Sequence, residues 1–279
     1  MADGPGTLYV VATPLGNLED VTLRALRVLR SVALVACEDT RRTARLLHAH
    51  GITTPTTSYF EHNERGKGAR ILEALRQGRD VALVSDAGTP GISDPGYRLV
   101  REAREEGLPV TPIPGPSAAV AALSVSGLPT DRFLFVGFLP SRSGARRAAL
   151  AELARGSQTL VIYESPVRVL ASLEDMQEIL GDRPAFLCRE ATKLHEEYRS
   201  APLSRLRSEL EGRGEIKGEI VLVVGGAAEP APASTETAEA LFARLTAEGR
   251  TRREAVKEVA RALGLPAREA YRRLLPDQE

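Results

Sequence analysis

The densest group of side chains that could perform chemistry lies in the segment CREATKLHEE, residues 188–197. It places Arg189, Glu190, Lys193 and His195 directly after an apolar run that is typical of a buried strand. The chain has only four lysines among its 37 basic residues, so arginine is its ordinary cation. Because a lysine can release a proton and an arginine cannot, we predict Lys193 as the catalytic base and Glu190 as its partner. The alternative is an ion pair between the two that only holds the strand end.

A second segment, LVSDAGTPGISDPG at residues 83–96, indicates a ligand-binding loop. It continues an apolar run and is then rich in glycine, which lets a ligand approach the backbone, in proline, which fixes φ, and in Asp, Ser and Thr oxygens. Neither G-x-G-x-x-G nor G-x-x-x-x-G-K-[ST] occurs in the chain, so no pyrophosphate or triphosphate cradle is expected. The loop therefore favours a ligand that carries positive charge. The alternative is a well-turned connection between a strand and a helix.

Strand-like and helical patterns alternate along the first 226 residues. In the first half of the chain the predicted strands are nearly continuous and valine-rich, as in a parallel sheet that is covered on both faces. The fold class is therefore α/β. The predicted strands are residues 7–13, 33–39, 80–86, 132–140, 158–165, 185–192 and 219–226, and the helices between them are residues 18–32, 40–50, 69–78, 96–107, 146–156 and 166–180.

Changes in composition mark the domain boundaries. The proline-rich stretch at residues 109–118 is predicted to connect two domains, with the boundary near Gly115. A cleft between two such domains is a common place for a ligand. We expect an N-terminal α/β domain over residues 1–115, a second α/β domain over 116–226, a linker over 227–237 and a helical appendix over 238–279.

The appendix contains a basic stretch within a neutral chain. Between Arg250 and Arg273 it has eight basic and three acidic residues, and its last two helices resemble a helix-turn-helix in outline. Arg252 and Arg253 are candidates for contacts with RNA phosphates, whereas a solvated helical face is the alternative. The three predicted helices are residues 239–249, 251–264 and 266–275.

Composition also excludes several classes of protein. A formal net charge of zero argues against whole-surface attraction to a polyanion. The two cysteines, Cys37 and Cys188, have no metal-ligand spacing, the H-x-H at residues 48–50 lacks a third ligand, and we expect no metal. The N-terminus lacks the basic start of an export signal, and five prolines interrupt the uncharged stretch at 108–130. A cytoplasmic protein with no membrane segment is expected.

Seven motifs follow one another, in order, from about Thr7 to Gly226: VVATPLGNLEDVTLRAL, ACEDTRRTARLL, LVSDAGTPGISDPG, PGPSAAVAAL, FVGFLP, YESPVR and CREATKLHEE. Together they resemble the tetrapyrrole-methylase superfamily, the class III fold of S-adenosylmethionine-dependent methyltransferases. More closely, they are similar to the branch that methylates a cytidine 2′-hydroxyl in small-subunit ribosomal RNA. The resemblance implies two α/β domains with S-adenosylmethionine in the cleft between them. It also implies small-subunit ribosomal RNA or the assembled subunit as partner, and a homodimer.

The same resemblance implies the binding residues. Thr89 stands where most superfamily members have Asp, so Asp86 or Asp94 is expected to meet the methionine ammonium. In CEDTRRT, Arg41 and Arg42 would face the mouth of the cleft and take RNA phosphates. The cofactor contacts carried over by motif are Pro14, Asp86, Gly88, Thr89, Pro90, Ser117, Ala118, Tyr163, Glu164, Ala191, Glu219, Ile220 and Val221.

Two other functions remain open from the sequence. One is a methyltransferase of the same fold that acts on a tetrapyrrole or a protein, and the other is a non-catalytic RNA-binding assembly factor. The basic C-terminal helices favour an RNA substrate over a porphyrinoid. The nucleotide methylated, the state of the RNA substrate and the general base are not fixed by the sequence.

Overall fold

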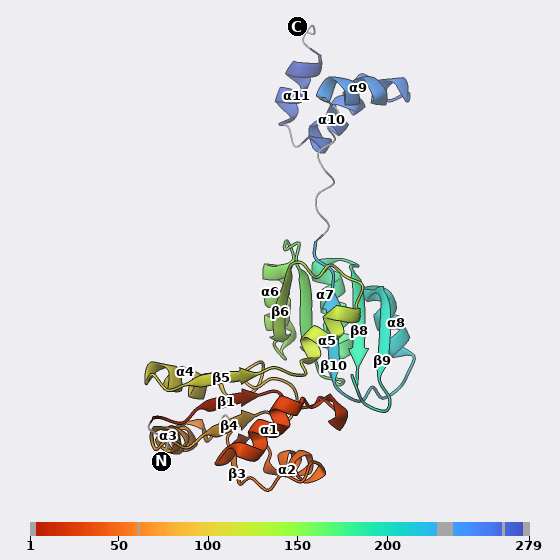
Figure 1. Ribbon diagram of the computed structural model, residues 1–279. Helices are drawn as coiled ribbons and strands as arrows, with labels where there is room; N and C mark the ends of the chain where they lie inside the picture. The colour runs from red at the N-terminus through yellow and green to blue at the C-terminus, as the bar shows by residue number, and fades with distance from the viewer. Residues whose placement is uncertain (1–3, 61, 228–236, 264–265, 276–279) are drawn as a thin grey trace. The chain divides into compact units, whose positions relative to one another are not determined.

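The computed structural model describes residues 4–60, 62–227, 237–263 and 266–275 (Figure 1). Its contacts divide the chain into two compact units, residues 1–227 and residues 228–279, and each is described by itself. The first unit contains two five-stranded sheets. We call the elements from β1 to β5 the first lobe and the elements from α5 to β10 the second lobe.

The first lobe has a parallel sheet in the order β3-β2-β4-β1-β5. A parallel sheet has its strand ends on one edge, so the loops that follow β1, β2 and β4 lie near one another. Its elements are β1 (Leu8–Val11), the short 3-10 helix η1 (Leu18–Asp20), α1 (Leu23–Ser31), β2 (Leu34–Cys37), α2 (Thr40–Ala49), β3 (Thr56–Ser58), α3 (Glu64–Arg76), β4 (Val81–Val84), α4 (Tyr97–Glu105) and β5 (Val110–Ile113).

Alternation along β4 explains why helices cover both faces of this sheet. Val81 and Leu83 pack with residues of α3 and α4, whereas Ala82 and Val84 pack with residues of α1 and α2. All four side chains are buried, which removes apolar surface from water on both sides of the strand. The valine-rich strand pattern is therefore confirmed as a parallel sheet covered on both faces.

The second lobe has a mixed sheet in the order β6-β7-β10-β8-β9. Strand β10 runs antiparallel to both β7 and β8. Helices α6, α7 and α8 contribute to the core cluster on one face, and α5 contributes to the cluster on the other. The elements are α5 (Ala118–Val125), β6 (Phe133–Phe138), α6 (Ser143–Leu153), β7 (Thr159–Glu164), α7 (Val169–Leu180), β8 (Pro184–Arg189), β9 (Glu197–Pro202), α8 (Leu203–Glu211) and β10 (Ile220–Val224).

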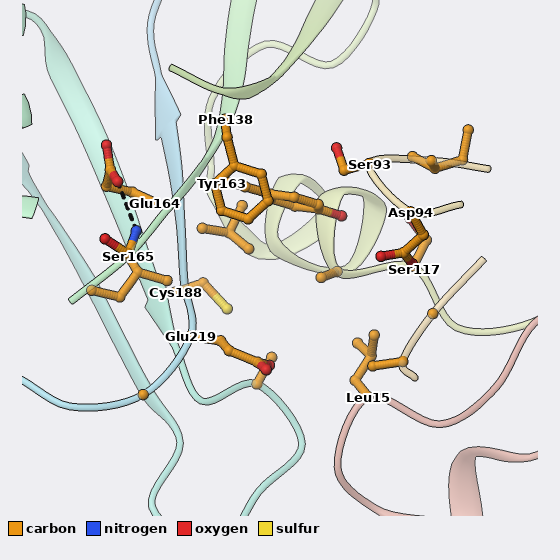
Figure 2. Close-up of a pocket in the computed structure, with 18 of the residues that line it drawn as sticks. Leu15, Ser93, Asp94, Ser117, Phe138, Tyr163, Glu164, Ser165, Cys188 and Glu219 are labelled. Atoms are coloured by element: carbon orange, nitrogen blue, oxygen red, sulfur yellow. Dashed lines mark hydrogen bonds between the residues drawn. The ribbon is translucent and has the colours of Figure 1, made fainter. Parts of the chain in front are cut away.

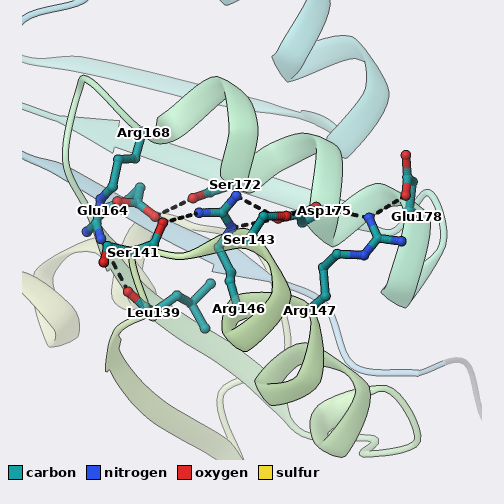
Figure 3. A network of polar contacts seen from close by, with 10 residues as sticks. All are labelled: Leu139, Ser141, Ser143, Arg146, Arg147, Glu164, Arg168, Ser172, Asp175 and Glu178. Carbon is teal, nitrogen blue, oxygen red and sulfur yellow. Dashed lines mark hydrogen bonds and ion pairs between the residues drawn. The ribbon is translucent and has the colours of Figure 1, made fainter.

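A polar network connects α6 to α7 (Figure 3). Arg146 and Asp175 are nearly buried, with side-chain exposures of 5% and 6%, and their ion pair is 2.6 Å long. Arg147 reaches the other oxygen of the same carboxylate at 3.0 Å, and Ser143 donates to it as well. Since both helices cover the same sheet, the network fixes their separation while the apolar side chains fill the space between them.

The second unit is a three-helix unit formed by α9 (Ala238–Ala247), α10 (Arg252–Ala262) and α11 (Ala267–Leu274). Thr251 and Glu254 form a capping box that starts α10. Buried Leu241 and Val259 share one apolar cluster. The predicted turn at 264–265 and most of the predicted linker at 227–237 lie outside the described residues.

Several elements differ from the sequence prediction. The proline-rich stretch at 109–118 is not only a connector, because β5 forms inside it and pairs with β1. Pro112 is tolerated there because β5 is an edge strand and needs partners on one side only. Strands β3 and β9 and helices α5 and α8 were not predicted. The α/β fold class is confirmed, whereas the division of residues 1–227 at Gly115 stays a prediction.

Candidate functional site

The main pocket is a cavity of about 330 Å³ lined by both lobes (Figure 2). The first lobe contributes the loops after β1 and β4, and the second lobe contributes the start of α5 and the pocket-facing ends of its strands. The lining residues are Leu15, Ala87, Gly88, Thr89, Ile92, Ser93, Asp94, Ser117, Ala118, Phe138, Tyr163, Glu164, Ser165, Pro166, Cys188, Ala191, Gly218, Glu219, Ile220 and Val221.

The antiparallel register of β10 explains how the second-lobe wall forms. Ile220, the first residue of β10, lies opposite Glu164 at the end of β7 and opposite Arg189 at the end of β8. Three segments that are far apart in the sequence therefore meet at one edge of the sheet. Tyr163 also reaches the start of α5, because its hydroxyl accepts a hydrogen bond from the Ala119 amide at 3.2 Å.

The pocket brings together ten of the thirteen residues predicted to contact the cofactor. The other three, Pro14, Asp86 and Pro90, are not among the residues that line it. The ten that line it are Gly88, Thr89, Ser117, Ala118, Tyr163, Glu164, Ala191, Glu219, Ile220 and Val221.

Asp86 and Asp94, the two aspartates predicted as alternative partners of the cofactor's ammonium group, have different surroundings. Asp86 accepts a hydrogen bond from the Asp39 amide at 3.0 Å and pairs with Arg42 at 3.4 Å, so it holds the start of α2. Asp94 lines the pocket and has no ion pair with any described cation. Burial raises the pKa of Asp94 to about 6, the negative charges of Asp86 and Glu219 add to the effect, and a hydrogen bond from Ser85 opposes it.

Glu164 lines the pocket, but its carboxylate is already occupied. It is fully buried, and it accepts hydrogen bonds from the Ser165 amide at 2.7 Å and the Ser172 hydroxyl at 2.5 Å. Arg168 pairs with the same carboxylate at 2.9 Å and donates to the Leu139 carbonyl (Figure 3). Glu164 therefore holds the turn at 164–166 in shape, and its oxygens are not free for a ligand.

Lys193 and Glu190, the predicted catalytic pair, form an ion pair of 2.7 Å beside the pocket. The ammonium of Lys193 also lies 3.2 Å from the carboxylate of Glu219, which does line the pocket. Burial lowers the pKa of Lys193, but hydrogen bonds and charge from Glu190 and Glu219 outweigh it, so the pKa is raised. This direction keeps Lys193 protonated and disfavours the role of general base that the sequence suggested.

Two glycines make room for this pair. A Cβ on Gly16, in the loop after β1, would overlap Cγ of Lys193, and a Cβ on Gly218 would overlap Cγ of Glu190. Gly218 also has a φ of +94°, which other residues rarely adopt. The lysine of the second lobe therefore lies directly against the backbone of the first lobe.

Backbone strain is concentrated at the pocket. Among the described residues, three that are not glycine have a positive φ: Ser93 at 60°, Glu190 at 53° and Thr192 at 65°. Ser93 lines the pocket, and the other two flank Ala191, which also lines it. Such conformations cost about 1–3 kcal/mol each and are typical of functional sites. Strain in both lobes therefore marks the same cavity.

The candidates for RNA contact are all exposed arginines. Arg41 forms a two-point pair with Asp39, at 3.0 and 2.7 Å, and its side chain is 87% exposed. Arg42 pairs with Asp86. Arg252 and Arg253 begin α10 and pair with no other described residue. A contact between any of these arginines and RNA stays a prediction.

Cys37 and Cys188 are free and buried. Burial raises the pKa of Cys188 to about 11, so this pocket thiol is protonated at neutral pH.

Within the described residues, no group of three or more His, Cys, Asp or Glu side chains has the arrangement of a metal site. No described helix is long and apolar enough to cross a membrane.

The residues present fit S-adenosylmethionine. The cavity lies within the range of about 300–1,000 Å³ that is usual for small-molecule sites. Phe138, Tyr163 and Val221 give apolar and aromatic surface for a purine. Glu219 supplies negative charge for a sulfonium or an ammonium group. Such a cofactor supplies an electrophilic methyl group when it is bound.

Some pocket residues were not predicted from the sequence. Leu15, Phe138 and Cys188 lie inside recognised motifs but are apolar, and an apolar residue next to a strand end gives no signal of its own. For Gly16 and Gly218 the sequence shows only that the residue is glycine, which permits a close approach. Which side chain approaches each of them, Lys193 or Glu190, is seen only in the structure.

The fold and the pocket define a two-lobed α/β methylase, in which a parallel and a mixed sheet share one ligand cavity at their strand ends. The chain belongs to the family of Tetrapyrrole (Corrin/Porphyrin) Methylases, whose family model matches residues 7–207.

Within this family the chain is similar to proteins named ribosomal RNA small subunit methyltransferase I. The relative from Pseudomonas aeruginosa is 50% identical over 238 residues, which cover 85% of this chain and 84% of the relative. The relative from Halalkalibacterium halodurans is 47% identical over 280 residues, which cover 96% of this chain and 94% of the relative.

Several solved structures have a similar fold. Cobalt precorrin-4 methyltransferase matches 78% of this chain with a TM-score of 0.60 and 17% identity. Diphthine synthase matches 79% with a TM-score of 0.60 and 17% identity. Uroporphyrin-III C-methyl transferase from Thermus thermophilus, complexed with S-adenyl homocysteine, matches 79% with a TM-score of 0.55 and 22% identity. At these identities the likeness shows the fold alone.

Proposed function

We propose that this protein transfers a methyl group from S-adenosylmethionine to the ribose 2′-hydroxyl of a cytidine in small-subunit (16S) ribosomal RNA. The observation that carries the proposal is the 47–50% identity, over most of the chain, to ribosomal RNA small subunit methyltransferases I, together with a pocket that fits the methyl donor. The solved tetrapyrrole and diphthine enzymes share the fold at 17–26% identity, well below that level.

The main pocket holds the methyl donor. Backbone groups of the loop after β4 would hold its amino-acid end, and the apolar wall of the second lobe would hold its purine. Aligning an acceptor oxygen with the methyl group and excluding water supplies much of the rate, about 7–11 kcal/mol in favourable model reactions.

Beside the donor, Lys193 provides a positive charge, and Glu190 holds it in position through their ion pair. A protonated Lys193, fixed by Glu190 and Glu219, stabilises negative charge that develops on the acceptor oxygen. The raised pKa of Lys193 suits this role, because the side chain stays cationic through the neutral range.

The partner is small-subunit ribosomal RNA, either free or in the assembled subunit, and the protein acts in the cytoplasm. Arg41, Arg42, Arg252 and Arg253 take RNA phosphates. We also propose a homodimer, on the resemblance of the chain to its superfamily. Sedimentation of the purified protein measures the mass of the particle and tests this part.

Ribose methylation maps of ribosomal RNA, recorded by mass spectrometry from cells with and without the protein, test the function. We expect one cytidine 2′-O-methyl group to disappear and to return on complementation. Ala118→Phe, which fills the pocket at the start of α5, should not restore it, whereas Val120→Phe, on the exposed side of the same helix, should. Identical maps from the two strains would reject the proposal. Methylation of a precorrin by the purified protein would favour the alternative substrate class.

A further inference from the structure

A second cavity of about 410 Å³ adjoins the main pocket. It is lined by Glu64 on α3, by the loop residues 93–96, and by Tyr97, Arg98 and Arg101 on α4. Ser93 and Asp94 line both cavities. A ligand in the second cavity therefore meets a ligand in the main pocket at Asp94.

The wall of the second cavity has the chemistry that recognises an unstacked nucleotide. Tyr97 is 70% exposed although it lines the cavity, and the guanidinium of Arg101 lies 6.0 Å from the centre of its ring. The ion pairs of the two arginines are long: 3.8 Å from Arg98 to Glu64 and 3.4 Å from Arg101 to Glu105. An aromatic ring stacks on a base, and guanidinium groups bind phosphate.

Among the acids of the main pocket wall, Asp94 is the one that pairs with no cation and whose only hydrogen-bond partner in the described residues is the Ser85 hydroxyl. The carboxylate of Glu164 is held by Arg168 and two hydrogen-bond donors, and the carboxylate of Glu219 pairs with Lys193. Among the described residues, no cation pairs with Asp94. An acid that is unpaired and lies between two ligand cavities is placed to exchange a proton with a ligand.

The charges around Asp94 come from several elements. The carboxylates that interact with it are Glu38 after β2, Asp86 after β4 and Glu219 before β10. The hydroxyl of Tyr163, on β7, also interacts with it. Arg98 and Arg101, on α4, line the second cavity together with Asp94. Burial and the nearby carboxylates raise the pKa of Asp94 to about 6. Asp94 is therefore ionised at neutral pH and still basic enough to take a proton.

We propose that the second cavity receives the acceptor nucleotide and that Asp94 accepts the proton of its 2′-hydroxyl; this rests on the proposed function. As the 2′-oxygen forms its bond to the methyl carbon, the carbon–sulfur bond breaks and its electron pair stays on sulfur. The hydroxyl proton passes to the carboxylate of Asp94 and then to solvent. The products are the 2′-O-methylated nucleotide and S-adenosylhomocysteine.

The first test is Asp94→Asn in the full-length protein, with small subunits as acceptor. We expect kcat to fall by about 100-fold or more, the usual contribution of a general base. Calorimetry should give an unchanged Kd for S-adenosylhomocysteine. The kcat of the wild type should fall as the pH drops through about 6, where Asp94 gains a proton, and this step should be absent from the variant. Asp86→Asn, a neighbouring acid outside the pocket wall, is the control: it should keep the step but move it to lower pH, because it removes one of the charges that raise the pKa of Asp94.

The second test addresses the cavity through Tyr97. Tyr97→Ala should raise KM for the small subunit about tenfold, in line with the loss of about 1–3 kcal/mol of base stacking. Tyr97→Phe keeps the ring and should retain the wild-type KM. Neither change should alter the Kd for S-adenosylhomocysteine, because Tyr97 does not line the main pocket.

Three results would overturn the inference. A weaker Kd for S-adenosylhomocysteine in Asp94→Asn with an unchanged kcat would make Asp94 a partner of the donor. A change of sedimenting mass in Tyr97→Ala would make the second cavity a contact between copies of the chain. Full activity of both variants would reject the acceptor subsite and leave the proposed function standing. A wild-type protein that binds S-adenosylhomocysteine but methylates no ribosomal RNA would reject both the proposed function and the subsite.

Discussion

Lys193 reaches its two carboxylate partners by crossing the backbone of Gly16, which belongs to the other lobe. Gly16→Ala would push a Cβ into Cγ of Lys193 and displace the ammonium from Glu190 and Glu219. We expect Gly16→Ala to lower kcat to about the level of Lys193→Ala. The double variant should be no worse than either single one, because residues that act as a unit are not additive.

This double-mutant cycle is measured as methylation of small subunits at saturating donor. Gly66→Ala, in a helix where no heavy atom lies within 4 Å of the added methyl, is the control and should leave kcat unchanged. Additive losses from Gly16→Ala and Lys193→Ala would mean that the glycine acts through something other than the lysine.

At the same scale, the sequence predicted which motifs form the pocket better than it predicted what each side chain does there. The motif around residues 163–164 was expected to bind the cofactor, and Glu164 does line the pocket. Its carboxylate, however, already pairs with Arg168 and accepts a hydrogen bond from Ser172. Asp86 and Asp94 are eight residues apart in one loop with the same chemistry, and only folding decides that Asp94 faces the cavity. Ion pairs between distant segments carry no local sequence signal.

At the scale of elements, the buried pair of Arg146 and Asp175 connects α6 to α7 (Figure 3). Asp175→Asn keeps the shape of the side chain but leaves the guanidinium of Arg146 buried without a counter-charge. We expect the free energy of unfolding to fall by about 3–5 kcal/mol. Glu178→Gln, which removes an exposed partner of Arg147 on the same helix, should change it little. Chemical denaturation measures both variants, and equal losses would contradict the argument.

The same pair predicts a dependence on pH. Burial raises the pKa of Asp175, but hydrogen bonds from Arg147, Arg146 and Ser143 outweigh it, so the pKa is lowered from 3.8. A carboxyl whose folded pKa is lowered stabilises the protein above its unfolded pKa, and this stability is lost as the pH falls through the folded value. The difference between wild type and Asp175→Asn should therefore be constant near neutral pH and shrink below about pH 4.

The elements that the sequence predicted share a regular local pattern, and those it missed do not. Strands β1, β2 and β4 of the parallel sheet are apolar runs and were predicted. Strand β9 has the polar sequence EYRSAP and was missed; it forms because it pairs with β8 along the whole length of that strand. Strand β5 contains a proline, and α5 has no polar face. The direction of β10 is set by its neighbours, so no property of its own residues could have predicted it.

At the scale of the whole molecule, a neutral chain carries a basic stretch within its C-terminal unit. Between Arg250 and Arg273 the basic residues outnumber the acidic ones by eight to three. Arg273 pairs with Glu239 across this unit, while Arg252 and Arg253 stay unpaired among the described residues. Charge that is not neutralised inside the unit is available to RNA phosphates, and the attraction is then sensitive to salt.

We therefore expect Arg252→Ala/Arg253→Ala to weaken binding to the small subunit without changing the Kd for S-adenosylhomocysteine. Each lost phosphate contact reduces the slope of log Kd against log salt by about 0.7–0.9, so the pair should reduce it by roughly 1.5. Arg70→Ala/Arg155→Ala removes the same charge from two exposed, unpaired positions in the described part of the first unit and is the control. Filter binding over a series of salt concentrations measures both slopes. An unchanged slope in the first variant would assign Arg252 and Arg253 to a solvated helical face.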